Sequence, residues 1–182
     1  MTNTEIGQAY LSYCRRRLTH EYLLKVKSCL EELNEEDVWW RAHETDNSIG
    51  NLLLHLCGNV RQWIISGIGG REDVRDRPAE FAARGSMKKP ELLRKFEDTV
   101  HEAGETLDRF DAGRLLEVRH IQQYDVTCLD AISHVIEHVS QHVGQIVYIT
   151  KLRKGIDLNL FALTKFGDRF SDPGSRPGVS EP

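Results

Sequence analysis

A chain of 182 residues, with 40% hydrophobic and 29% charged side chains, has the composition of one ordinary globular domain. Its formal net charge of -4 gives no general attraction to nucleic acid or to an anionic membrane, so we expect neither as a partner. No apolar run approaches the roughly 18 residues needed to cross a bilayer, and the first residues lack the pattern of a secretory signal. Four scattered cysteines without a Cys-x-x-Cys pair predict reduced thiols in a cytoplasmic protein.

Four segments have the apolar spacing of amphipathic helices. No segment of the sequence has the pattern of a sheet strand. The helices are expected at residues 4–33, 46–67, 90–110 and 127–154, and each of positions 46–48 holds a good N-cap residue. Pro90 is typical of a first helical turn, Thr127 with Asp130 is a variant of the capping box, and Gly155 ends the last helix. The expected fold is therefore all-α, a helical bundle.

Two of the connections between these helices are long. Residues 69–89 are rich in glycine, arginine and aspartate, and we expect them to form a mobile flap over one end of the bundle. Residues 111–125 contain a run, Glu117 to Tyr124, that could be extended. From about Ser171 the chain has no apolar face, which predicts one domain over 1–170 and a disordered tail over 171–182.

The most informative feature is a histidine pair in the last helix, His138 and His142. Residues four apart on an α-helix lie about 40° apart around the axis and roughly 6 Å apart along it, so both imidazoles can reach one ion. His134 precedes the pair by one turn. Apolar residues flank this stripe and indicate that it faces the core: Ile132, Val135, Val139, Val143 and Ile146.

The second helix carries a matching polar column within an apolar surface: Asn51, His55, Asn59 and Gln62. Buried polar side chains need partners, and a metal ion held by His55, His138 and His142 would satisfy both columns. Three neutral imidazoles suit zinc, nickel or iron and leave a position open for water or substrate. Water bound there would be acidified toward neutral pH, and a thiol could bind as its thiolate.

Spacing alone leaves other interpretations open. A single His-x-x-x-His pair is a weak signal, and a lone buried histidine such as His55 is more often a hydrogen-bonded core residue. The peptidase motif His-Glu-x-x-His is broken by Val139, which stands in place of the glutamate. Residues 134–138 match the inverted motif His-x-x-Glu-His, but Glu137 points about 100° away from His138. Four histidines lack any such context and are expected at the surface or in packing: His20, His43, His101 and His120.

The order of these motifs resembles the DinB superfamily. The resemblance is carried by Asn51-Leu-Leu-Leu-His55-Leu in the second helix and by His-x-x-x-His followed by Val-Gly-Gln-Ile in the last. Within that superfamily, residues 47–56, Trp63, Gly69-Gly70 and Thr150-Lys151 resemble a subfamily of unknown function, over about residues 5–165.

This resemblance implies an up-down four-helix bundle with a metal site whose ligands are His55, His138 and His142. It also implies a homodimer, because several relatives form one. His134 lies outside the expected ligand set, so we expect it to support the ligands or to face a substrate. The same role is expected of Asn51, Asn59 and Gln145.

Two classes of function follow from the site and the resemblance. Because characterised relatives include thiol-dependent transferases and hydrolase-like proteins, the leading hypothesis is a metalloenzyme. It would activate water or a low-molecular-weight thiol for attack on a small-molecule electrophile. Flap arginines could meet an anionic substrate, although each by itself is expected to be solvated: Arg71, Arg75, Arg77 and Arg84.

The alternative is a non-catalytic module in which the metal stabilises the bundle or serves a stress-related binding role. It predicts that no ligand-sized cavity adjoins the site. A nucleic-acid-binding function rests only on the basic cluster Arg15 to Arg17, which is also expected on a solvated helix face.

Overall fold

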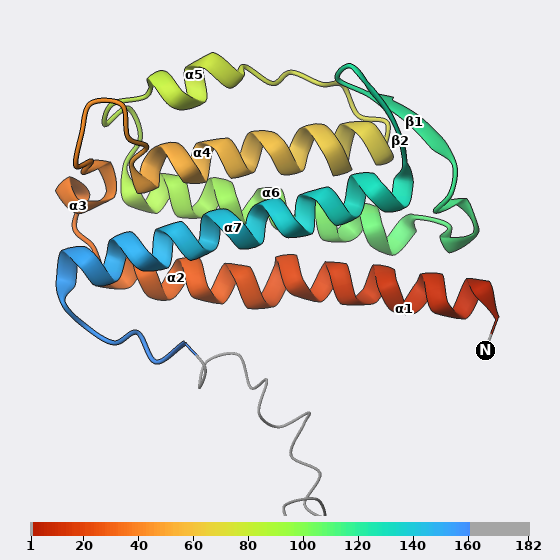
Figure 1. Cartoon of the computed structure of the whole chain (residues 1–182), viewed down its shortest axis with the longest axis horizontal. Coiled ribbons are helices and arrows are strands. Elements are labelled where there is room, and N and C mark those ends of the chain that lie inside the picture. Colours follow the sequence, from red (N-terminus) through yellow and green to blue (C-terminus); the bar gives the residue numbers. More distant parts are fainter. Residues whose placement is uncertain (1, 161–182) are drawn as a thin grey trace, which may run out of the picture.

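The structure is a computed structural model, and it describes residues 2–160. It is mostly helical, with four long helical segments lying side by side around one core (Figure 1). The tail predicted over 171–182 lies outside the described residues. None of the described helices is long and apolar enough to cross a bilayer.

Each long segment lies where the sequence predicts a helix. The first consists of α1 (Asn3–Arg16), the π-helical η1 (Arg17–Tyr22) and α2 (Leu23–Glu32). The second consists of α4 (Ile49–Val60) and the π-helical η2 (Arg61–Ile68). The third is α6 (Lys89–Arg109), and the fourth is α7 (Cys128–Lys154).

Local signals explain where these helices begin and end. The Ser48 side chain caps α4 by accepting a hydrogen bond from the Asn51 amide, and Thr127 caps α7 in the same way. Gly155 ends α7 with a φ of 65°, a left-handed conformation that favours glycine. The start of α4 and both ends of α7 therefore follow from local signals in the sequence.

The shorter elements connect the long ones. They are α3 (Glu35–Trp39), α5 (Arg77–Ala82), the 3-10 turn η3 (Ala112–Arg114), β1 (Val118–Ile121) and β2 (Tyr124–Thr127). The two strands form an antiparallel hairpin in which Val118 is opposite Thr127. The run predicted to be extended is therefore a small hairpin. Its strands are too short for an alternating sequence pattern to reveal a sheet.

The flap segment (residues 69–89) lies along α4 rather than over one end of the bundle (Figure 1), which corrects the expected position. It contains α5, and the Asn51 side chain anchors it by donating to the carbonyl oxygens of Glu80 at 2.9 Å and Ala83 at 3.1 Å. The composition of the segment indicated an irregular connection, but not the surface onto which it docks. Its mobility stays a prediction.

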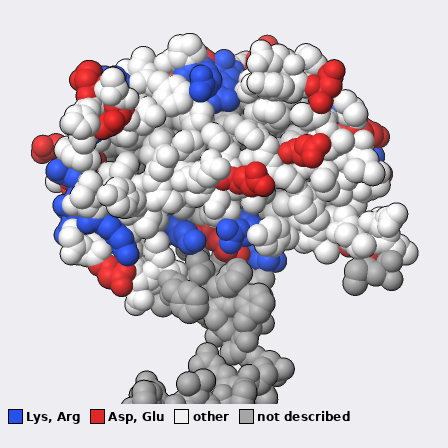
Figure 2. Space-filling model, in the orientation of Figure 1, with Lys and Arg blue, Asp and Glu red and all other residues white. Residues whose placement is uncertain are grey.

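The surface charges are mixed in sign. Figure 2 shows Lys and Arg scattered among Asp and Glu, with uncharged surface between them. Within the basic cluster, Arg15 pairs with Asp108 at 2.7 Å, and Arg17 pairs with the buried Glu21. Because these arginines have acidic partners, they do not form a free basic patch, in agreement with the expected helix face.

Candidate metal centre

Three histidines converge between α4 and α7. His55 extends from α4, and His138 and His142 extend from α7, one helical turn apart. One ring nitrogen from each of the three lies within 4.8 Å of the other two, and the Nε2 atoms of His55 and His138 are 2.8 Å apart. Donor atoms around one tetrahedral zinc ion lie about 3.3 Å apart, so this set of imidazoles fits a single divalent ion after small side-chain shifts.

Two of these histidines have a partner behind the ring. His55 Nδ1 is 3.0 Å from Glu80 Oε2, and His142 Nδ1 is 2.8 Å from Gln145 Oε1. Because the Gln145 oxygen accepts, the His142 ring donates from Nδ1 and leaves Nε2 free as a lone-pair donor. The Glu80 carboxylate favours the same tautomer of His55, whose Nδ1 also lies 3.1 Å from the donor Arg75 Nη2. Such outer partners fix the orientation of metal-binding histidines and raise their basicity.

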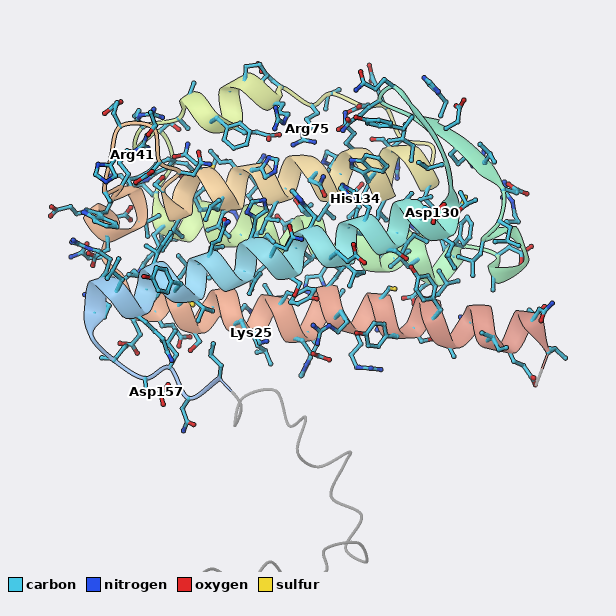
Figure 3. The ribbon with its side chains drawn as sticks, viewed as in Figure 1. Lys25, Arg41, Arg75, Asp130, His134 and Asp157 are labelled. Atoms are coloured by element: carbon cyan, nitrogen blue, oxygen red, sulfur yellow. The ribbon has the colours of Figure 1, made fainter. Side chains whose placement is uncertain are left out.

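Glu80 is itself held by an arginine of the flap segment. Its Oε1 accepts from Arg75 Nε at 2.8 Å and its Oε2 from Arg75 Nη2 at 2.9 Å, and both side chains are more than nine-tenths buried. Burial opposes ionisation of Glu80, but the hydrogen bonds from Arg75 and His55 outweigh it and keep the pKa of Glu80 below its ordinary value. Figure 3 shows Arg75 between α5 and α4, so this arginine is not the solvated residue that its sequence context predicted.

Burial keeps the histidines of α7 uncharged. Desolvation, together with repulsion from His142, His55 and His134, lowers the pKa of His138 to about 3. Desolvation also lowers the pKa of His142, against the hydrogen bond that its ring donates to Gln145. Neutral imidazoles are the form that binds metal, so protons compete weakly at these two positions near neutral pH.

The other residues singled out in the sequence have different surroundings. His134 stacks on His138 with ring centroids 5.4 Å apart, and its own pKa is lowered by burial. Asn59 is buried one turn after His55, whereas Asn51 anchors the flap segment. Glu137 is exposed, as expected for a residue that points away from His138.

The sequence did not reveal Glu80 as a partner of His55. One local signal pointed to a close approach at this place. Gly58 lies within the apolar helix α4, and a Cβ atom built on it would lie 1.8 Å from Glu80 Oε1. Only glycine therefore lets the carboxylate pack against α4.

Two cavities lie near this cluster, and none of the three histidines lines either of them. One, of about 870 Å³, lies between α4, the flap segment and α6, and Arg75 and Glu80 line it. The other, of about 650 Å³, lies between residues 40–47 and α7, and Gln145 lines it beside Tyr148. Each cavity thus reaches a side chain that is hydrogen-bonded to a candidate ligand.

Comparison with known proteins agrees with this fold. The model of a family described as "Protein of unknown function (DUF1572)" matches residues 5–166. The chain belongs to this family. The structure of this DUF1572 member resembles the crystal structure of a DinB-like protein from Bacillus cereus ATCC 10987, with a TM-score of 0.60 and 13% sequence identity. The similarity covers 76% of this chain and 89% of that chain. The structural likeness shows that the DUF1572 member shares the fold of that DinB-like protein. No curated protein matches the chain significantly.

Proposed function

We propose that this protein binds a divalent metal ion through His55, His138 and His142 and uses it in small-molecule chemistry. The observation that carries the proposal is the convergence of three imidazoles, two of which have an oxygen partner behind Nδ1. Three nitrogen ligands suit zinc, nickel or iron and leave room for a further ligand. When bound, such an ion lowers the pKa of a water or thiol ligand and supplies a nucleophile near neutral pH.

The residues of the chain prepare this site in three ways. Glu80 holds the ring of His55, and Arg75 balances the negative charge of Glu80. Burial keeps His138 neutral, so it is available as a ligand near neutral pH. The flap segment covers one side of α4 and thereby limits access of bulk water to His55.

The reaction we propose is attack by water or by a low-molecular-weight thiol on a small electrophilic substrate. The non-catalytic alternative predicts that no ligand-sized cavity adjoins the site. Cavities of about 870 and 650 Å³ reach Glu80 and Gln145, the partners of His55 and His142, but none of the three histidines lines either cavity. A small molecule in either cavity would lie one side chain away from a candidate ligand, and this proximity is what supports the enzyme over that alternative. We also propose a homodimer, on the superfamily resemblance alone, and sedimentation velocity would test it.

Metal analysis of protein purified without a histidine tag tests the proposal directly. We expect near-stoichiometric metal in the native chain, loss of the metal in His138→Ala, and no change in His101→Ala. His101 is an exposed histidine of α6 and serves as the matched control. Metal retained at full stoichiometry in His138→Ala would overturn the site.

Turnover is tested separately on the metal-loaded protein. A panel of small electrophiles, with and without thiol cofactors, should reveal a reaction that His138→Ala lacks and His101→Ala keeps. If the loaded protein binds metal but converts nothing in either series, the transferase version of the proposal is wrong and the non-catalytic module gains support.

A further inference from the structure

The cavity between residues 40–47 and α7 has mostly apolar walls. Its volume is about 650 Å³, within the range of roughly 300–1,000 Å³ that is common for small-molecule sites. Trp40 and Tyr148 supply aromatic surface, and Leu52 of α4 adds aliphatic surface. Tyr148 is 68% exposed, so a ligand can reach its ring. These walls suit the aromatic or apolar body of a small molecule.

Arg41 is the one cation among the described residues that line this cavity, and Figure 3 shows it beside the beginning of α4. It is half-buried, and its Nη2 atom donates to the neutral Asn51 Oδ1 at 3.0 Å. No carboxylate within residues 2–160 forms an ion pair with it. Asp46, the acidic residue of the same walls, instead accepts from the His43 amide at 2.9 Å. Arg41 therefore presents a partly desolvated positive charge that an anionic ligand can balance.

The larger cavity, of about 870 Å³, offers no comparable cation in the part of the chain that the structure describes. Two of its arginines are already paired, Arg75 with Glu80 and Arg61 with Glu102. Its remaining cations are exposed, among them Arg94, and water screens their charges. The smaller cavity is therefore the better site for an anion, and Arg94 provides a matched control.

The candidate metal centre also favours an anion. Burial keeps His138 and His142 uncharged, and Arg75 balances the charge of Glu80. A divalent ion bound there would thus carry positive charge that none of the described side chains at the centre neutralises. Gln145 joins the two places, because it lines the cavity and accepts a hydrogen bond from His142.

We propose that this cavity binds a small organic carboxylate with an aromatic or apolar body. Arg41 pairs with the carboxylate, Trp40 and Tyr148 contact the body, and the remainder of the ligand extends toward Gln145 and His142. This inference deepens the proposed function by naming the substrate class, and only the substrate role of the ligand rests on that function.

Nuclear magnetic resonance of the Trp40 indole N–H tests this binding on the metal-free chain. The resonance is assigned by its loss in Trp40→Phe, and the indole of Trp63, which does not line the cavity, is the internal reference. Three probes are titrated: phenylacetate, its neutral analogue phenylacetamide, and acetate, which has no ring. We expect phenylacetate to shift the Trp40 resonance saturably. Each of the other two should bind about tenfold more weakly, because one lacks the charge and the other lacks the apolar body.

The variant Arg41→Gln removes the charge while keeping a polar side chain. We expect it to weaken phenylacetate binding about tenfold and to leave phenylacetamide binding unchanged. The matched control Arg94→Gln, in the wall of the larger cavity, should change neither. Tyr148→Ala should weaken binding of both aromatic probes roughly threefold or more. Because Tyr148 is exposed, this variant should fold, and it tests the site even if Arg41→Gln does not fold.

Four results would overturn the proposal. They are equal binding of phenylacetate and phenylacetamide by the native chain, loss of phenylacetate binding in Arg94→Gln instead of Arg41→Gln, phenylacetate binding that Tyr148→Ala leaves unchanged, and a Trp40 resonance that no probe shifts up to the solubility limit.

Repeating the titrations on zinc-loaded protein separates this cavity from the metal centre. We expect zinc to tighten phenylacetate binding roughly threefold or more, because the ion and the carboxylate attract each other. Equal affinity with and without zinc would refute the substrate role. Zinc binding without a phenylacetate response refutes only the carboxylate site, whereas a phenylacetate response without zinc binding refutes only the metal centre.

Discussion

Replacing Gly58 by alanine should disconnect the flap segment from the candidate metal centre. The added Cβ would lie 1.8 Å from Glu80 Oε1 and 2.9 Å from Arg75 Nε, so both side chains must move away from α4. Glu80 then loses its hydrogen bond to His55. The flap segment also loses its close packing on the helix. This substitution is small, but it reaches an ion pair that is almost completely buried.

Two opposing effects set the expected size of the change. A hydrogen bond to a charged group contributes about 1.5–3 kcal/mol. The better helix propensity of alanine offsets about 0.5–1 kcal/mol of that loss. We therefore expect Gly58→Ala to lower the free energy of unfolding by about 1–2 kcal/mol, a fall in Tm of roughly 2–8 °C for a domain of this size. Metal affinity should fall about 10- to 100-fold, as it does when the outer partner of a ligand histidine is removed.

Gly144→Ala is the matched control. Gly144 also lies within a helix that carries candidate ligands, but a Cβ atom built on it would meet no atom within 4 Å. Alanine should therefore raise stability there by about 0.5–1 kcal/mol and leave zinc affinity unchanged. Urea denaturation and zinc titration calorimetry measure both effects. If Gly58→Ala were stabilised like Gly144→Ala and bound zinc equally well, the coupling of Glu80 to His55 would be refuted.

Two further predictions concern pH and the end of the last helix. The metal-free protein should lose stability as the pH falls below 6.5. The pKa of His138 is about 3 in the folded protein and 6.5 in the unfolded chain, so the unfolded chain takes up the proton first and is favoured by it. Between pH 6.5 and 5 this group should cost about 1 kcal/mol, allowing for its partial exposure, and urea denaturation of His138→Gln should lack that part of the slope. Asp37→Asn should lower stability at pH 7 by about 1.5–3 kcal/mol, because it weakens the contacts of a buried carboxylate with Arg153 and Lys154. Its control Asp157→Asn, in an exposed pair with Lys151, should leave thermal unfolding unchanged, and an equal effect of the two would contradict this explanation.

Much of the helical architecture could be predicted because its signals are local. Thr127 caps α7 and Gly155 ends it, as the sequence indicated. The spacing of His138 and His142 guarantees that both lie on one helix face. The opposing column on α4 made His55 their expected partner, and the structure brings the three together.

Other side chains could not be assigned from spacing. Asn51 belongs to the same polar column as His55, but its amide meets backbone carbonyl groups of the flap segment. Arg75 was expected to be solvated because its neighbours in the chain are polar, yet it is paired with Glu80 against α4. In both cases the contact is made by the flap segment, whose apolar residues have no regular spacing. The sequence therefore does not indicate where this segment docks.

The sequence by itself determined the four helices, their inward polar columns and the three histidines that could share an ion, because residue spacing fixes which side chains share a face of a helix. Only the tertiary structure shows which side chains contact those histidines. Glu80 is 25 residues from His55 in the chain and reaches it only because the flap segment docks on Gly58. Trp63 likewise meets His134 only through the packing of η2 against α7. Contacts between distant segments depend on how whole elements dock, and helical periodicity carries no information about that.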